Sequence, residues 1–287
     1  MRLRLGGREF DDRARLVMAI VNRTPDSFYD KGLTWAEDAA LERVRQVVEA
    51  GADLVDIGGI KAAPGADVGV DEEKRRVVAF VERVRGEHPD LLISVDTWRA
   101  EVGRAVLQAG ADVLNDAWGG ADPHLVEVAA EHGASVVLTH TGGVTPRTRP
   151  HRIEYDDVVA DVLASLTAQA ERAEAAGLPA ERVVVDPAHD FGKNTWHSIE
   201  VTRRLDEVVA LDRPVLVSLS NKDFVGESLD LPVGERLTGT LAATAVAAWH
   251  GAHVYRVHEV GPTRQVLDMV AVIRGDLPPA RTTRGLA

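Results

Sequence analysis

The chain has 287 residues, 45% of them hydrophobic, and a formal net charge of −12 at pH 7. This length fits one large domain or two small ones, and the negative charge argues against general binding to nucleic-acid phosphates. The absence of cysteine excludes disulfides and thiolate zinc sites. No segment approaches the roughly 18 apolar residues of a membrane span, and the first residues lack the apolar core of a secretory signal. A soluble, cytoplasmic protein is therefore expected.

The first predicted element is a short hairpin over residues 3–10 that turns at Gly6 and Gly7. After it, strand-like apolar runs alternate with amphipathic helical stretches, which is the pattern of a parallel sheet covered by helices. Eight such pairs favour an α/β fold of the (β/α)8 or TIM-barrel type, with the hairpin closing the barrel bottom. The strands are predicted at residues 15–22, 53–59, 91–97, 112–117, 135–140, 182–188, 214–220 and 253–260.

The predicted helices carry apolar residues three and four positions apart, as at Val77, Val81 and Val84. Several end at a glycine that the next strand follows directly, which is typical of a left-handed helix terminus. The segments after the strands are longer and more polar than those before them, so the site is expected at the carboxyl face. Residues 1–275 are predicted to form a single domain, and residues 276–287 a flexible tail. The helix-ending glycines are Gly51, Gly110, Gly133 and Gly251.

Polar residues stand at the carboxyl ends of nearly all the predicted strands. A single Asp or Asn there is as often a turn or helix cap as a site residue. Several polar residues at one barrel mouth, however, predict a polar ligand that completes their hydrogen bonds. Carboxylates and an amide suit a flat heterocycle with N–H and C=O groups. The positively charged side chains Lys222, Arg256 and His258 suit an anion such as diphosphate. Without a metal-ligand motif, a Mg²⁺ carried by phosphates is favoured over one held by the protein alone. The strand-end residues are Asn22, Asp56, Asp96, Asn115, Asp116, His140, Asp186, Ser220, Lys222, Arg256 and His258.

Seven motifs occur in order along these units: NRTPDSFYDKG, DIGG followed by PGA, SVDT, LNDAW, DPAHDFGK, SNKDFVG and YRVHEV. Together they resemble the motifs of dihydropteroate synthase, and the resemblance extends from Val17 to about Val260. It implies a barrel that joins 6-hydroxymethyl-7,8-dihydropterin diphosphate to p-aminobenzoate and releases diphosphate.

The resemblance also implies roles for individual residues. The pterin ring would be held by Asp96, Asn115, Asp186 and Lys222, with Phe191 in the pocket wall. The diphosphate would be held by Asn22, Arg256 and His258, with Mg²⁺ near Asn22. Stabilising charge on the leaving group is usually the largest contribution to such catalysis. Arg256 could also lie on the face of the ring, and Asp186 has the alternative of capping the strand end before Pro187.

The departures from the family's usual sequence begin in two loops. The second mobile loop usually carries Thr and Arg, where this chain has Ala62 and Ala63. These alanines carry no charge and donate no side-chain hydrogen bond, and Lys61 is offset from the lost Arg and lacks its forked geometry. In the first loop, the usual Val, Ser and Gly are replaced, and an Arg is lost from the SNKDFVG motif. The residues at these four positions are Arg23, Tyr29, Lys31 and Asn221.

Two further departures concern the pterin pocket. Thr139 replaces the Met that usually precedes His140, and Asp190 replaces the Gly that usually precedes Phe191. A glycine beside a bound ring lets the backbone come close, so a carboxylate there is expected to cost space and desolvation. The motifs of the barrel are therefore kept, whereas several residues that would contact the ligands are replaced. This pattern resembles that of second-copy actinobacterial paralogues of the synthase.

Four functions remain open from the sequence. The favoured one is a synthase homologue that is inactive or very weak but still binds pterin-like, p-aminobenzoate-like or sulfone-like ligands. An alternative is a competent dihydropteroate synthase in which Arg23 or Lys61 restores the missing charge. The others are a barrel with a different small-molecule task, like the related pterin-binding methyltransferases, and a non-catalytic partner protein. The absence of a corrinoid-binding module weakens the methyl-transfer hypothesis.

A last feature concerns assembly. The stretch Leu237 to Ala252 consists mainly of Ala, Thr and Gly with few charges. Packing onto the barrel explains one face, but an outward surface without Lys and Glu permits close approach of a second helix. A homodimer with this helix at a two-fold interface is predicted, as the resemblance also implies, with Ala243 and Ala247 facing outward.

Overall fold

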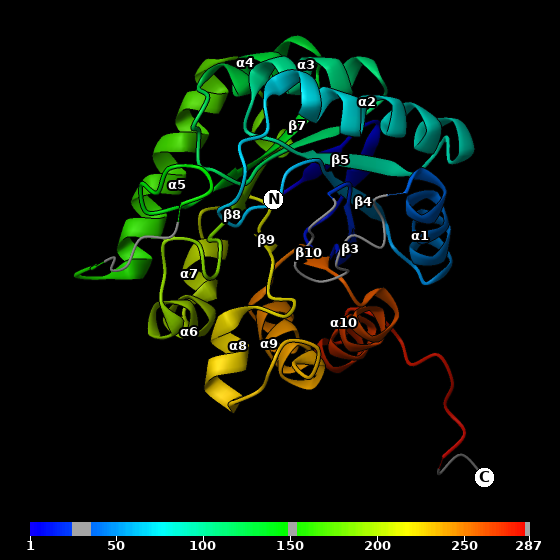
Figure 1. Ribbon diagram of the computed structural model, residues 1–287. Coiled ribbons are helices and arrows are strands. Elements are labelled where there is room, and N and C mark those ends of the chain that lie inside the picture. The colour runs from blue at the N-terminus through cyan, green and yellow to red at the C-terminus, as the bar shows by residue number, and fades with distance from the viewer. Residues whose placement is uncertain (25–35, 149–153, 285–287) are drawn as a thin grey trace.

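The computed structural model describes residues 1–24, 36–148 and 154–284, and these form the predicted barrel (Figure 1). In this part of the chain, eight parallel strands pair in the order β8-β7-β6-β5-β4-β3-β10-β9, and a bridge from Val185 to Val215 joins β8 to β9. The sheet is thereby closed. The strands are β3 (Leu16–Asn22), β4 (Leu54–Gly58), β5 (Leu92–Asp96), β6 (Val113–Asp116), β7 (Ser135–Thr139), β8 (Val183–Asp186), β9 (Leu216–Val217) and β10 (Val254–Val257).

Helices follow the strands and form an outer ring (Figure 1). Their apolar stripes face the sheet, as where α2 buries Val77, Val81 and Val84. The predicted glycine helix termini are confirmed, with φ of 95° at Gly51 and 107° at Gly110. The helices are α1 (Glu37–Glu49), α2 (Val70–Glu87), α3 (Ala100–Gln108), α4 (His124–Glu131), α5 (Val158–Ala175), α6 (Thr195–Arg203), α7 (Leu205–Val209), α8 (Asp223–Leu229), α9 (Leu237–His250) and α10 (Val260–Arg274), with a 3-10 turn at Ala180–Arg182.

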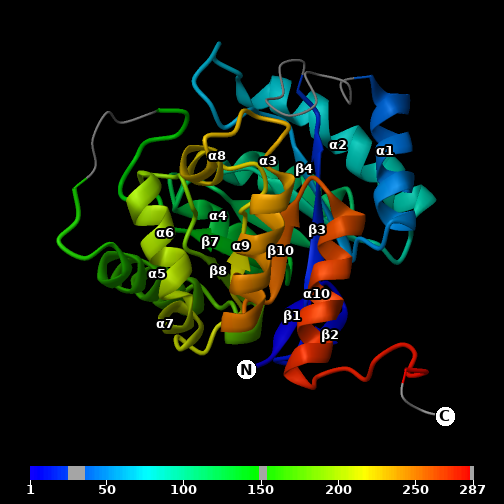
Figure 2. The same ribbon diagram turned by 90° about the horizontal axis from the view of Figure 1, so that it is seen from below.

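The amino end of the barrel is filled by apolar side chains and covered by the predicted hairpin. The hairpin consists of β1 (Leu3–Leu5) and β2 (Arg8–Phe10), which pair antiparallel, and Figure 2 shows it at the end of the barrel where the strands begin. Leu3 and Leu5 are buried against the first inward side chains of the strands, so the hairpin closes the barrel bottom as predicted. These floor residues are Leu16, Met18, Leu54, Leu92, Val113, Val137, Val184, Leu216 and Val254.

Helix α9 does not present the face expected from the sequence. Ala247 is fully buried and Ala243 is half-buried against the core, so the prediction that Ala247 faces outward is wrong. The physical reason is helical spacing: position 247 lies three residues beyond Thr244, which packs on the barrel, and therefore shares its face. The exposed face consists instead of Thr238, Ala242, Val246 and Trp249.

The last described segment, residues 276–284, contains no helix or strand. Asp276 is tied back to the barrel by an ion pair of 2.5 Å with Arg15. The domain boundary at 275 and the flexibility of the tail stay predictions. None of the helices in the described ranges is long and apolar enough to cross a membrane.

Candidate active site at the carboxyl end of the barrel

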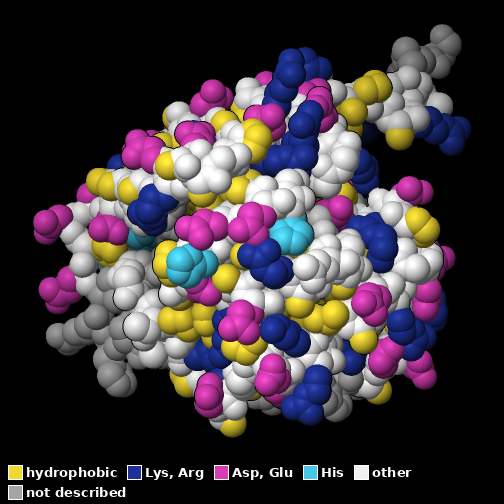
Figure 3. Space-filling model, turned by 90° about the horizontal axis from the view of Figure 1, so that it is seen from above, with side chains coloured by type: hydrophobic (Ala, Val, Ile, Leu, Met, Phe, Trp, Pro, Cys, Tyr) yellow, Lys and Arg dark blue, Asp and Glu magenta, His cyan; other side chains and the backbone are white. Residues whose placement is uncertain are grey.

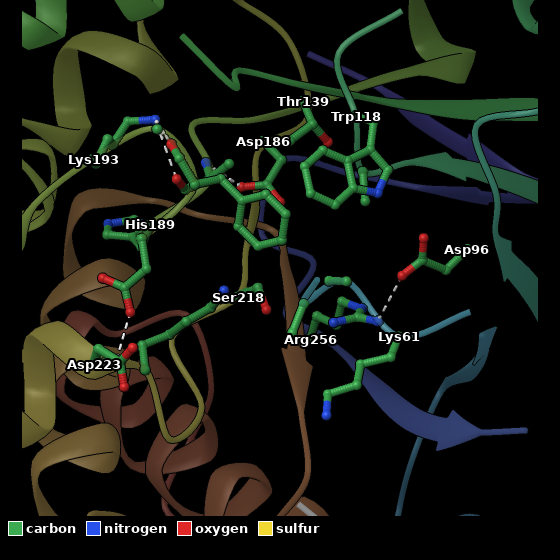
Figure 4. Close-up of a pocket in the computed structure, with 18 of the residues that line it drawn as sticks. Lys61, Asp96, Trp118, Thr139, Asp186, His189, Lys193, Ser218, Asp223 and Arg256 are labelled. Carbon is green, nitrogen blue, oxygen red and sulfur yellow. Dashed lines mark hydrogen bonds and ion pairs between the residues drawn. The ribbon is translucent and has the colours of Figure 1, made fainter. Parts of the chain in front are cut away.

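A cavity of about 740 Å³ opens at the carboxyl ends of the strands, and Figure 4 shows part of its lining. The positions to which the resemblance assigns ligand roles, and the two loop alanines, all line this cavity, although they come from separate strands and loops. They are Asn22, Ala62, Ala63, Asp96, Asn115, Asp186, Phe191, Lys222, Arg256 and His258.

Strand alternation explains how the chain builds this cavity. Side chains two positions apart point to the same face of a strand, so a residue two positions beyond a floor residue also points into the barrel. Each such strand thus places an apolar residue in the floor and a polar residue above it. The pairs are Leu54 and Asp56, Val113 and Asn115, Val184 and Asp186, and Val254 and Arg256.

The Arg256 guanidinium is held by a network of buried polar groups in this upper layer. Its Nε lies 2.6 Å from Asp56 Oδ2, and its Nη2 lies 3.2 Å from Asp96 Oδ2. Asp56 also accepts hydrogen bonds from Ser94 Oγ at 2.6 Å and Asn115 Nδ2 at 3.1 Å. Because two carboxylates hold its guanidinium from different strands, Arg256 is fixed in one orientation at the cavity wall. Asp56 therefore has a positioning role that the sequence only hinted at by its strand-end place.

Burial governs the ionisation of the cavity carboxyls. It raises the pKa of Asp186 to about 6, and it raises the pKa of Asp96 to about 7 although Arg256 opposes the shift. Asp186 Oδ1 accepts a hydrogen bond of 2.7 Å from the Ala188 N–H, so the strand-end cap considered from the sequence is present. A cap and a ligand-binding carboxylate are compatible, because a carboxylate accepts several hydrogen bonds.

One wall of the cavity is aromatic. The rings of Trp118 and Phe191 meet edge to face with centroids 5.2 Å apart, and Lys222 Nζ lies 4.6 Å from the Phe191 centroid. Burial lowers the pKa of Lys222. Trp118 was not predicted as a site residue, although it ends the LNDAW motif.

Asp190 has partners that the sequence did not reveal. Its φ of 66° is left-handed, which explains why glycine is favoured at this position. The carboxylate accepts hydrogen bonds from the Asp223 N–H at 2.5 Å and from Ser198 Oγ at 3.1 Å, so it caps the start of α8. These bonds offset the expected desolvation cost, and they direct the carboxylate to α8, whose N-cap residue is Lys222.

Three strand-end residues do not line the cavity: Asp56, which holds Arg256, and Asp116 and His140, which serve loops. Asp116 accepts hydrogen bonds from the N–H groups of Trp118 and Gly120, at 3.1 and 2.7 Å, and so caps its own turn. His140 Nε2 lies 2.7 Å from Asp161, and its Nδ1 lies 2.6 Å from Lys193 Nζ.

Lys193 is buried and binds backbone carbonyl groups of the loop after β8. Its ammonium lies 3.1 Å from the carbonyl oxygens of both Ala188 and Phe191, and burial lowers its pKa to about 7. These two hydrogen bonds stabilise the conformation of the loop that carries Phe191. The DPAHDFGK motif contains Lys193, but only the folded loop reveals its acceptors.

Among the described residues, Arg23 is not placed in the cavity where the missing arginine would lie. The Arg23 guanidinium lies 4.8 Å from the ring centroid of Phe80 on α2 and does not line the cavity. Lys61 does line it, beside Ala62 and Ala63. Tyr29 and Lys31 lie outside the described residues.

The cavity residues alone offer too few oxygen donors to coordinate a metal ion. The described ranges contain no group of three or more His, Cys, Asp or Glu side chains that could hold a metal. Asn22 offers an amide oxygen, while Asp56 and Asp96 are engaged by Arg256. This donor set fits Mg²⁺ only where diphosphate supplies much of the oxygen coordination.

A polar cavity with one aromatic wall at the mouth of a (β/α)8 barrel is typical of enzymes that bind small molecules. The chain belongs to the pterin-binding enzyme family, whose sequence profile matches residues 18–258. Within it, dihydropteroate synthase of Escherichia coli K12 is 38% identical over 271 residues, 94% of this chain and 95% of that protein.

Proteins named inactive dihydropteroate synthase 2 are more similar. The one from Mycobacterium leprae is 57% identical over 291 residues, covering all of both chains. The one from Mycobacterium tuberculosis H37Rv is 58% identical over 280 residues, 96% of this chain and 88% of that protein. The resemblance inferred from the motifs is thus confirmed.

Solved structures agree with the fold. A Yersinia pestis dihydropteroate synthase with a sulfonamide drug superposes with a TM-score of 0.90 at 36% identity, covering 96% of this chain and 100% of that one. A Xanthomonas albilineans dihydropteroate synthase with 4-aminobenzoic acid has a TM-score of 0.86 at 37% identity, covering 96% and 99%.

Proposed function

We propose that this chain is a dihydropteroate synthase homologue that has lost most or all synthase activity and still binds a pterin-type ligand. The observation that carries the proposal is the position of Ala62 and Ala63 in the cavity wall, where the family usually has Thr and Arg. Catalysis of this displacement needs donors for the departing diphosphate, and two alanine side chains supply none. The similarity to the mycobacterial proteins named inactive supports the proposal.

The remaining lining residues support retained binding. Asp96, Asn115 and Asp186 would pair with the N–H and C=O groups of the pterin ring, with Lys222 above Phe191 at one side. Arg256, His258 and Asn22 would hold a diphosphate group, with Mg²⁺ carried by that diphosphate. The lining also includes apolar residues, among them Ile60, Ala62 and Val144, which would accommodate p-aminobenzoate or a sulfone-like ring. A cytoplasmic location is proposed with this function.

A competent synthase is the second candidate, and one observation favours it. Lys61 lines the cavity beside the two alanines, so a cation is present near the lost arginine. A lysine offers a single ammonium where an arginine offers a planar fork, and the two are not equivalent toward a diphosphate.

Calorimetric titration and a turnover assay test the proposal together. We expect diphosphate with Mg²⁺ to bind, and turnover of pterin diphosphate with p-aminobenzoate to be at least about 100-fold below that of the Escherichia coli enzyme assayed beside it. A reduction of about 100-fold is what the loss of one hydrogen-bond donor to a developing negative charge typically costs in turnover. Normal turnover without any heat from diphosphate would contradict the proposal.

The double variant Ala62→Thr, Ala63→Arg adds a second arm. We expect it to raise residual turnover only modestly, by less than about tenfold, because the changes at Thr139 and Asp190 remain. A full rescue by this loop alone would show that those two pocket changes are harmless.

A further inference from the structure

The hydroxyl of Thr139 is an unpaired polar group in the cavity wall. Thr139 ends β7, is 3% exposed and lines the cavity. Within the described part of the chain, its Oγ1 has no hydrogen-bond partner. A buried hydroxyl without a partner is unfavourable, so a partner is expected from something that enters the cavity.

The position of this hydroxyl gives the chemistry of that partner. Thr139 is the register partner of Asp186 on the adjacent β8, and Figure 4 shows it between Asp186 and Trp118. Both point inward, because Val137 and Val184, two residues earlier, lie in the barrel floor. A hydroxyl that can donate thus stands beside a carboxylate that can accept.

This pair complements a lactam edge, in which a ring N–H stands next to a ring carbonyl. The carboxylate accepts from the N–H, and the hydroxyl donates to the carbonyl oxygen. Packing alone does not account for threonine here, because valine has the same shape at β7 and leaves no polar atom unpaired.

We propose that Thr139 is a specificity-determining residue that donates its hydroxyl hydrogen to the ring carbonyl of a lactam-bearing bicyclic heterocycle whose N–H is accepted by Asp186. This inference rests on the proposed pterin binding and deepens it. It assigns the cavity a preference for a ring carbonyl over an unsubstituted ring carbon at that edge, because the hydroxyl then gains a partner.

Titration of the full-length protein with two probes tests the preference. Pterin carries a carbonyl at ring position 4, and 2-aminopteridine carries only hydrogen there. We expect Thr139→Val to weaken pterin binding about tenfold, the effect of one hydrogen bond, and to change 2-aminopteridine binding less than about twofold. Thr139→Ser, which keeps the hydroxyl, should bind pterin within about threefold of the wild type.

The outcomes separate this inference from the proposed function. Wild type that binds pterin while Thr139→Val binds it equally well would overturn the role of the hydroxyl, as when a water satisfies it. Equal weakening of both probes would also overturn the role and would point to packing. Wild type that binds neither pteridine would overturn the proposed function and this inference with it.

Discussion

At the scale of single residues, burial rather than charge pairing sets the chemistry of the cavity. Asp96 lies 3.2 Å from the Arg256 guanidinium, yet burial still raises its pKa to about 7. Asp186, with burial as the first cause, has a pKa raised to about 6. Both carboxyls are therefore neutral in acid and become ionised acceptors only as the pH rises through 6 to 7.

This titration predicts a pH-dependent affinity for pterin. Because an ionised carboxylate accepts ring N–H groups and a protonated one accepts them poorly, affinity should be constant above pH 7.5 and fall as the pH drops toward 5. Below the lower pKa, the fall should approach about tenfold per pH unit for each carboxyl involved. Calorimetric titration at four pH values measures it.

The variant Asp186→Asn is the control for that experiment. It should bind pterin more weakly at pH 7.5 and lose the step near pH 6, while the contribution of Asp96 persists. An affinity that stays flat for the wild type from pH 7.5 to 5 would show that these carboxyls do not meet the ligand.

The residue scale also shows what the sequence could and could not predict. Strand-end position alone was sufficient to place Asn115, Asp186 and Arg256 at one mouth, because it is a local property of the sequence. By itself it did not separate them from Asp116, which is one residue beyond Asn115, faces the other side of the strand and accepts N–H groups of its own turn. Nor could it indicate Lys193, whose acceptors meet only after the loop folds.

At the scale of elements, the loop from β4 to α2 is tied to the loop from β7 to α5. Arg147 Nη1 donates to the Ala66 carbonyl at 2.6 Å, and its Nε donates to the Ala63 carbonyl at 3.4 Å. The bonded residues are far apart in sequence, with Arg147 lying 81 positions after Ala66. No local sequence pattern predicts hydrogen bonds between residues so far apart. The sequence analysis could therefore state only that the second loop lacks the usual Thr and Arg.

Removing this link should loosen the second loop. In Arg147→Ala, both hydrogen bonds to loop carbonyls are lost, and the Lys61–Ala62 peptide bond should become accessible more often. We expect trypsin to cut after Lys61 about tenfold faster than in the wild type, which corresponds to about 1.4 kcal/mol of local opening free energy. Mass spectrometry of the fragments measures the rate.

The matched control is Arg281→Ala, which removes an arginine from the exposed terminal segment. It should leave cleavage after Lys61 unchanged. Equal cleavage rates in Arg147→Ala and the wild type would mean that the β4–α2 loop holds its place without Arg147.

At the scale of the whole molecule, the helical faces differ in their charge. Figure 3 shows the face over the helices at the top of Figure 1, where positive and negative side chains are interspersed. Ion pairs there link neighbouring helices, as between Lys74 and Glu101 or between Arg104 and Glu131. Such interspersed charges are typical of a well-solvated face.

The face formed by α9 and α10 is different, because large apolar side chains are exposed on it. Val246 and Trp249 are 44% and 55% exposed on α9, and Met269 and Ile273 are 56% and 61% exposed on α10. The two helices pack against each other, so these side chains lie on adjacent elements (Figure 2). Exposed apolar patches on adjoining helices are typical of an interaction site.

We therefore predict that the chain forms a homodimer through this α9–α10 face. A two-fold axis places the same patch on both sides, so one substitution alters the interface twice. Val246→Glu puts two unpaired carboxylates into an apolar interface, and since Val246 is exposed in the single chain, its fold should be unaffected. We expect wild type to sediment as a dimer at micromolar concentration and Val246→Glu as a monomer with an unchanged melting temperature. Val233→Glu, at a residue of similar exposure, 41%, before α9, should remain dimeric. A monomeric wild type, or a dimer that survives Val246→Glu, would place the interface elsewhere or remove it.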